Sequence, residues 1–410
     1  MDRLRWLTAG ESHGPQLTAI LEGCPAGLAV SAAEIDVQLA RRQKGYGRGE
    51  RQSIEQDRVE IVGGVRHGRT TGAPVALVVR NRDAANWGDV LSAGAPTEAE
   101  NGSSEDAGEA GAGVSGAPAD FGAGAKPVTV PRPGHADLGG ALLYDHGDIR
   151  DVIERASARE TAARVACGAV ARRLLAEVGC AIGSHVVAIG EVDSGATLTE
   201  ELLSRTDDDP VRCLDPAAAA RMRAAIDAAA AAGDTAGGVV EVTAFGFPPG
   251  VGSYVQGDRR LSSRLAEAAL SVPAMKGVEI GLGFAVARVP GSRAHDPLAW
   301  DEGRGYHRLS NHAGGVEGGI STGEPIVLRV AMKPISTLRT PLATVELGTH
   351  EALESRYERA DVCAVPAAGI VLEAVVALAL ADALLERFGG ATVGDVIEAV
   401  TAFTTRCARR

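Results

Sequence analysis

The chain has 410 residues, with 41 Lys and Arg against 53 Asp and Glu, so its net charge is −12. This acidic balance argues against a dedicated binder of nucleic acid or of anionic membranes, and a 45% hydrophobic share allows a sizeable core. The six scattered cysteines form no CxxC pair, which is typical of a reducing compartment and argues against a zinc ribbon. The N-terminus has no apolar stretch long enough for a signal peptide, so we expect a cytoplasmic protein.

Local sequence signals predict four helices. Capping boxes stand at 31–34 and 157–160, and Asp215 precedes a proline at the first position of an Ala-rich run. The stretch 371–385 is apolar but carries two acidic residues and is too short to span a bilayer, which needs about 20 apolar residues, so we expect a buried central helix there. The predicted helices cover 32–43, 157 to near Gly179, 216 to about Gly233, and 367–388.

Five segments that alternate in polarity or carry β-branched residues are predicted strands: 16–22, 59–62, 74–79, 239–245 and 326–330. Long helices and separated strands without a regular βαβ rhythm indicate an α+β fold. Segment 18–27 resembles segment 242–250, since both end in a Gly-x-Pro-x-Gly turn. This echo is either an old duplication, giving a pseudo-twofold core, or a chance recurrence of the turn.

Residues 92–126 consist largely of Ala, Gly, Ser and acidic residues. Such a low-complexity segment buries too little apolar area to offset its ordering entropy, so we expect a disordered loop. A linker between two domains is the alternative. Because the flanks near Asn86 and Pro131 look like parts of one site, we favour an insertion within a single domain that spans 1–410.

Two clusters in the first fifty residues could carry chemistry. His13 stands in a turn between small residues, where its ring is exposed and is either catalytic or structural. In the segment 41–51, five cations interleave with three glycines. Guanidinium groups bind phosphate and carboxylate oxygens bidentately, so this loop favours a small, multiply anionic ligand over a solvated basic helix end.

Two further clusters follow the insertion. In 131–137, prolines stiffen the backbone around Arg132 and His135, which suits a binding or acid–base site. His135 and Asp137 could instead bind a metal, but no HxxxH or HxH pattern accompanies them, so we expect no metal site. The segment 155–161 is either an anion site at a helix start or an ordinary capped helix.

The last clusters lie in the C-terminal third. The glycine-rich segment 311–323 is either a plain surface turn or a loop whose amides line a flat ring or a phosphate, and 333–337 adds a cation and two hydroxyls. Asp361, ahead of the apolar helix, is either an acid with a perturbed pKa or a helix-entry residue.

Six blocks resemble the signature blocks of the chorismate synthase family, in the family's order from Gly10 to Glu373: GESHG, ARRQKGYGRG, RPGHAD, RASARETAARVA, GGVEGGISTG with MKPIST, and RADVCAVPAAGIVLE. The resemblance implies a lyase that converts 5-enolpyruvylshikimate 3-phosphate to chorismate and phosphate. This 1,4-anti elimination is the last step of the shikimate pathway, and it needs reduced FMN without net redox change. The implied fold is a β-α-β sandwich with central helices between antiparallel sheets and internal pseudo-symmetry, assembled as a homotetramer.

The resemblance also implies residue roles. His13 aligns with the histidine that protonates the departing phosphate, His135 with the one beside the flavin's pyrimidine end, and Asp361 with the acid that relays the substrate proton. Residues implied to bind substrate or NADPH are Ser12, Arg42, Arg48, Arg51 and Arg132. Residues implied to bind FMN are Arg155, Ala156, Ser157, Pro273, Ala274, Gly318, Lys333, Pro334, Ile335, Ser336, Thr337 and Arg359. Proline at 273 replaces a polar residue of some relatives, and Arg339 adds a cation without an assigned role.

The source of reduced flavin is open, because family members either use NADPH themselves or depend on an external reductase. No appended reductase domain is visible, which favours the external source. One alternative function is a flavin- or anion-binding homologue that lost the elimination, although His13, His135 and Asp361 are all present. Another is phosphoryl transfer, but the chain lacks a GxxxxGK[ST] loop.

Overall fold

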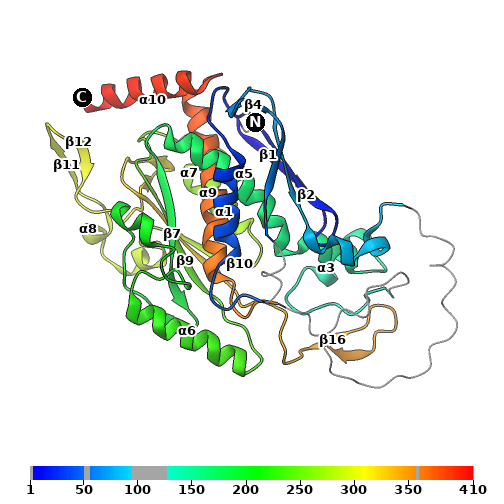
Figure 1. Ribbon diagram of the computed structural model, residues 1–410. Coiled ribbons are helices and arrows are strands. Elements are labelled where there is room, and N and C mark those ends of the chain that lie inside the picture. Colours follow the sequence, from blue (N-terminus) through cyan, green and yellow to red (C-terminus); the bar gives the residue numbers. More distant parts are fainter. Residues whose placement is uncertain (1–2, 50–55, 95–126, 357–359, 410) are drawn as a thin grey trace.

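The computed structural model describes residues 3–49, 56–94, 127–356 and 360–409. Two antiparallel sheets enclose a layer of helices (Figure 1). The first sheet contains β1 (Arg5–Ala9), β2 (Gln16–Glu22), β6 (Val75–Arg80) and β3 (Val59–Gly63), in that spatial order. The second contains β10 (Met275–Ile280), β15 (Ile326–Met332), β9 (Gly238–Phe245), β7 (Ala181–Ile189) and β8 (Val192–Asp193).

Four helices fill the space between the sheets (Figure 1). The long helices α5 (Thr161–Ala176) and α9 (Val365–Phe388) pack against each other, and α5 contacts the first sheet while α9 contacts the second. Helix α1 (Ala32–Gln43) lies against α5, and α7 (Leu261–Leu270) lies against α9. By length and composition α9 could cross a membrane, but 94% of its most apolar window is buried inside the protein, as expected of a core helix.

The remaining elements lie around this core. The other helices are α3 (Asp137–Tyr144), α4 (Arg150–Ala156), α6 (Pro216–Ala231), α8 (Gly291–Ala294) and α10 (Val393–Ala408). Short antiparallel pairs are β4 (Val65–Arg66) with β5 (Arg69–Thr70), β11 (Leu298–Asp301) with β12 (Gly305–Arg308), β13 (Val316–Glu317) with β14 (Ile320–Ser321), and β16 (Ala343–Val345) with β17 (Ala352–Glu354).

The two halves of the fold share one topology. Strands β1, β2, β3 and β6 with helices α1 and α5 follow the order β-β-α-β-β-α, and β7, β9, β10 and β15 with α7 and α9 repeat it. In both sheets the four strands are arranged first, second, fourth, third. The echoed segments include β2 and β9, which are the second strand of each half. The predicted α+β sandwich with internal pseudo-symmetry is therefore confirmed, and the two echoed turns follow equivalent strands of the two halves.

Most predicted elements are present, with one instructive difference. The capping box at Ser31 forms, all five predicted strands exist, and α9 begins two residues earlier than expected. The box at Ser157 does not open the long helix. The Ser157 hydroxyl accepts from the Arg159 amide. The Glu160 carboxylate accepts from Arg164 and Thr8 rather than from the Ser157 amide, as a capping box would require. Residues 158–160 therefore form a 3₁₀ turn, and α5 starts at Thr161.

Candidate active site

The first cluster surrounds His13 in the connection between β1 and β2. The His13 Nδ1 atom lies 2.7 Å from Oε1 of Glu154, and the His13 amide donates to Oε2 of the same carboxylate at 2.7 Å. The imidazole stacks on Trp87 with ring centroids 3.9 Å apart and planes inclined by 21°. On its other edge, Nε2 lies 3.9 Å from Oδ2 of Asp83. The ring is thus fixed by one carboxylate and one indole.

The end of α4 closes around the same loop. The Ser157 hydroxyl lies 3.0 Å from the Ser12 hydroxyl, and Arg155 donates to the carbonyls of Thr8 and Gly10. Ala156 is the last residue of α4 and lies between these two contacts in sequence. The predicted positions Ser12, His13 and 155–157 therefore lie together, although the first two are separated from the rest by more than 140 residues of sequence.

The second cluster joins the loop after α1 to the start of α9. Arg48 Nη1 donates to Asp361 at 2.6 Å, and the Gly49 amide donates to the same carboxylate at 2.7 Å. The Nε atom of Arg48 is buried and has no hydrogen-bond partner in the described part of the chain. The pair therefore holds one guanidinium with unused donor capacity beside an ionisable acid.

Arg42 occupies a different environment from Arg48. Its guanidinium is buried and donates to the Thr161 hydroxyl at 2.9 Å and the Ala158 carbonyl at 2.8 Å, where α5 begins. Burial lowers the pKa of Arg42 to about 10, while the nearby Asp57 carboxylate opposes that shift. Arg42 therefore connects the first cluster to the second, and its donors are already used by the protein.

The third cluster is the loop 131–137. Arg132 Nε donates to Asp137 at 2.8 Å, and His135 Nδ1 lies 2.5 Å from the same carboxylate. Burial by itself raises the pKa of Asp137, but hydrogen bonds from His135 and Arg132 hold that pKa well below its usual range. Gly134 has φ of +75°, a left-handed conformation that glycine adopts without strain and that turns His135 back onto Asp137.

Segment 333–337 packs against this loop. The Lys333 ammonium donates to the Gly134 carbonyl at 2.6 Å, and the Lys333 amide donates to the Ala274 carbonyl at 3.0 Å. A carbonyl of the same segment, that of Ile335, accepts from the Thr235 hydroxyl at 2.7 Å. Partial burial lowers the pKa of Lys333, and Lys276 contributes in the same direction. A partly buried ammonium group suits an anionic ligand.

The other predicted residues are placed as follows. Pro334, Ser336 and Thr337 belong to the segment just described, and Pro273 directly precedes Ala274 before β10. Gly318 lies at the turn between β13 and β14. The carbonyl of the neighbouring Gly319 accepts hydrogen bonds from the amides of Ser253 and Leu261, which belong to none of the three clusters. Arg51 and Arg359 lie outside the described residues, as do 95–126 of the predicted loop 92–126.

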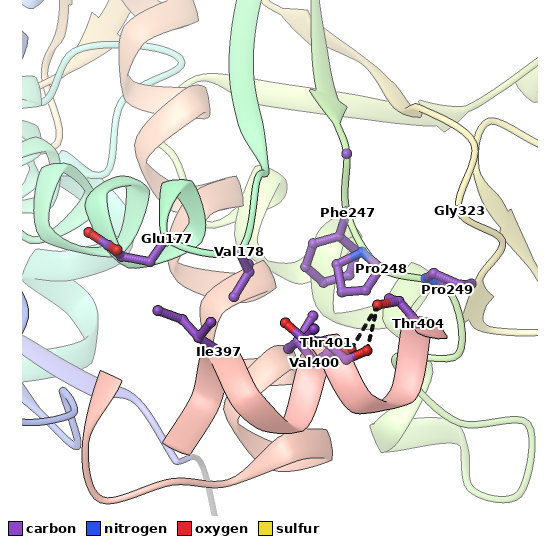
Figure 2. A pocket seen from close by; sticks show the side chains of 11 residues that line it. Glu177, Val178, Phe247, Pro248, Pro249, Gly323, Ile397, Val400, Thr401 and Thr404 are labelled. Atoms are coloured by element: carbon purple, nitrogen blue, oxygen red, sulfur yellow. Dashed lines mark hydrogen bonds between the residues drawn. The ribbon is translucent and has the colours of Figure 1, made fainter. Parts of the chain in front are cut away.

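A groove of about 340 Å³ lies elsewhere, between α10 and the turn at 246–249 (Figure 2). Figure 2 shows Phe247, Ile397 and Val400 beside it, and Glu177 is its one charged lining residue within the described chain. None of its lining residues belongs to the three clusters. Since the groove brings no acid–base groups or cations together, it is not where the chemistry takes place.

Sequence reasoning missed Glu154 and Trp87, which orient His13, and Asp83, which lies near its Nε2 atom. Glu154 directly precedes the RASARE block, and Trp87 lies shortly before the low-complexity segment that starts at residue 92. The sequence signal that could have identified these two residues was their position near the RASARE block and the low-complexity segment. Asp137, considered as a metal ligand, instead pairs with Arg132 and His135. Among the described residues, no three His, Cys, Asp or Glu side chains gather as a metal site would require.

Each of the two histidines has a carboxylate at Nδ1 that orients the ring, and Nδ1 of His135 also lies 3.1 Å from Nη2 of Arg132. In each ring, Nε2 is the nitrogen left for a ligand. Arginine and lysine side chains accompany both, so the site has positive groups within an acidic protein. Together these features define an enzyme that binds a small polyanion and moves protons.

Comparison with known proteins identifies the enzyme family. The chorismate synthase family model matches residues 4–385. Chorismate synthase from Bacillus cytotoxicus is 52% identical, and chorismate synthase 1 from Bacillus cereus is 54% identical, each over 94% of this chain and 95% of the relative. A crystal structure of a chorismate synthase superposes with a TM-score of 0.75 at 39% identity, covering 99% of both chains.

The chain therefore belongs to the chorismate synthase family. Its activity is that of a lyase, which converts 5-enolpyruvylshikimate 3-phosphate to chorismate and phosphate in the shikimate pathway. This places it in aromatic amino-acid biosynthesis, and the family's reaction requires a reduced flavin.

Proposed function

We propose that the three clusters form the active site for this elimination, with reduced FMN as the flavin. The observation that carries the proposal is the shared arrangement of the two histidines. His13 and His135 each have Nδ1 against a buried carboxylate, so each can present Nε2 to a bound ligand. Such a pair, together with a neighbouring acid, suits a reaction that adds a proton to one oxygen and removes another proton from carbon.

The arginines bind the substrate in this proposal. The substrate carries one phosphate and two carboxylates, which require several cationic donors. Arg48 has an unpartnered buried Nε, and Arg132 is held rigidly by Asp137. Arg42 contributes chiefly by fixing the start of α5, because its donors bind Thr161 and Ala158. Ser12 and Arg51 complete the predicted substrate or NADPH set.

The residues present fit a flavin phosphate and ring. Lys333 supplies a partly buried cation, and its backbone amide donates to the Ala274 carbonyl. When bound, reduced FMN supplies an electron that assists loss of the phosphate and is then recovered. Residues 155–157, 273–274, 333–337, Gly318 and Arg359 are the proposed flavin contacts.

The proton steps belong to three side chains. His13 Nε2 donates a proton to the departing phosphate, and Asp361 accepts the proton that leaves the substrate. His135 stabilises negative charge at the pyrimidine end of the flavin, because its Nδ1 is already bound to Asp137. The Asp361 carboxylate is held in position by the hydrogen bonds that it accepts from the Gly49 amide and the Arg48 guanidinium.

The assembly, location and reductant are parts of the same proposal. We propose a homotetramer, in which another copy would bring Gly318, at the turn between β13 and β14, to a site. We further propose a cytoplasmic enzyme that receives reduced flavin from an external reductase, with NADPH as the upstream reductant. Nucleic acid and membranes are not proposed as partners.

The proposal is tested by an anaerobic assay with photoreduced FMN and 5-enolpyruvylshikimate 3-phosphate, in which phosphate and chorismate are measured together. Equal amounts of both, formed with reduced but not with oxidised FMN, are expected. Binding of flavin and substrate without product would instead favour a homologue that has lost the elimination. Light scattering of the same sample measures the mass of the assembly.

A further inference from the structure

Glu154 has a buried carboxylate, and among the described residues both of the hydrogen bonds that this carboxylate accepts come from one residue. Its side chain is 2% exposed, and it accepts from the amide and from Nδ1 of His13, each at 2.7 Å. The two bonds use different carboxylate oxygens. Glu154 therefore fixes both the backbone and the ring of His13, from a helix 141 residues further along the chain.

The chemistry of the pair fixes the tautomer. An ionised carboxylate only accepts hydrogen bonds, so Nδ1 of His13 must carry a hydrogen. The other ring nitrogen, Nε2, is then the atom that exchanges a proton with a ligand. A buried carboxylate without a cationic partner is costly, and a protonated imidazole in contact with it compensates that charge.

Other groups face His13 but act differently. Asp83 lies 3.9 Å from Nε2, beyond hydrogen-bond distance, and its oxygens accept from Asn86 and from the Trp87 indole. Trp87 stacks on the ring and restricts its rotation. Arg155, next to Glu154 in sequence, donates to Thr8 and Gly10 instead. Glu154 is thus the group that bonds to the imidazole directly.

We propose that Glu154 is the positioning residue for His13. It holds Nδ1 as a donor, directs Nε2 toward the leaving phosphate and stabilises the protonated ring that performs the transfer. The inference rests on the role proposed above for His13. It assigns to Glu154 no contact with substrate or flavin.

The decisive variant is Glu154→Gln, which keeps the size of the side chain but removes its charge. We expect kcat for chorismate formation to fall about 10- to 100-fold, with the KM for substrate changed by less than about 2-fold. Asp151→Asn, an exposed carboxylate on the same helix, is the matched control and should leave all values unchanged.

A double-variant comparison separates positioning from a general structural effect. In a His13→Ala background, adding Glu154→Gln should cause no further loss, because the positioned ring is already absent. A further loss of the same size, or wild-type kcat in the single variant, would overturn the proposal. Glu154→Asp, which retains the charge but shortens the side chain, should recover part of the lost kcat, and an equal loss would count against it.

Nitrogen NMR of the histidine rings provides a readout that does not depend on turnover. His13, assigned by comparison with His13→Gln, should show the Nδ1–H form in the wild type and lose it in Glu154→Gln. If the wild-type protein forms no chorismate yet shows this change, the proposed function fails and the positioning role stands. An unchanged ring spectrum in Glu154→Gln would refute the positioning role whatever the activity.

Discussion

The contact between α5 and α9 makes a quantitative prediction for Gly168→Ala. A Cβ on Gly168 would lie 2.4 Å from Cβ, 2.6 Å from Cα and 2.8 Å from the carbonyl oxygen of Ala374. Ordinary carbon contacts need about 3.5 Å or more, so the two helices would have to separate by about 1 Å. Because the obstructing atoms are backbone or attached to it, we take the upper end of overpacking costs, about 3 kcal/mol.

Helix propensity opposes this cost. Alanine favours a helix interior over glycine by about 1 kcal/mol, so the net expectation for Gly168→Ala is a destabilisation of about 2 kcal/mol. Gly139→Ala is the matched control, because Gly139 lies within α3 and a Cβ there would meet no atom within 4 Å. That variant should gain stability by up to about 1 kcal/mol.

Urea unfolding of both variants and the wild type, followed by circular dichroism, measures the difference. The result expected is a lower midpoint for Gly168→Ala and an equal or higher one for Gly139→Ala. If Gly168→Ala were as stable as Gly139→Ala, the close approach of α5 and α9 would be wrong. The central layer of the sandwich would then have to be packed differently from the arrangement in Figure 1.

Three further predictions concern charged and titratable groups. His13→Ala and His135→Ala should each lower the rate of chorismate formation by roughly 10²- to 10⁴-fold, and near-normal turnover in both would contradict their assigned roles. Arg48→Ala should mainly weaken substrate binding, measured as a raised KM, and an unchanged affinity would count against it. Glu373 is buried, which raises its pKa, but three arginines lower that pKa to about 2, so its stabilising effect is present above about pH 4.5 and is lost as the pH falls toward 2. Glu373→Gln should therefore lower the free energy of unfolding by about 3 kcal/mol at pH 7 and by progressively less below about pH 4, and a pH-independent penalty would contradict this.

Where sequence prediction succeeded, the determining signals were local. The helix 32–43 has its capping residues adjacent to its apolar face, so no distant contact was needed to place it. The box at 157–160 has the same residue types but a different outcome, because Arg164 and Thr8 bind Glu160. A hydrogen bond from the distant Thr8, together with the local ion pair to Arg164 four residues further on, thus overrode the capping pattern.

The same distinction holds for the site. Loops rich in Gly, Pro and Arg marked His13, Arg48 and His135 as candidates, since such loops expose side chains to ligands. Glu154 could not be found in this way, because it lies on a helix and its importance depends on a loop 141 residues away. For Arg42 the residue type indicated a ligand contact, whereas the fold uses its guanidinium at the start of α5.

The repeated topology brings remote blocks of sequence to one place. In each half, the connection from the fourth strand to the second helix is long in sequence: it spans 81–160 between β6 and α5, and 333–364 between β15 and α9. The first of these connections carries His135 and Glu154, and the second carries Lys333 and Asp361.

Contacts between the two connections follow from the shared helical layer. Lys333 of one bonds to Gly134 of the other, and Arg42 bridges from α1 to the start of α5 beside the Arg48–Asp361 pair. A repeated β-β-α-β-β-α unit thus supplies the frame, and the two equivalent connections carry the acids, bases and cations. Since each connection alone holds only part of the set, neither half of the chain should bind the substrate by itself.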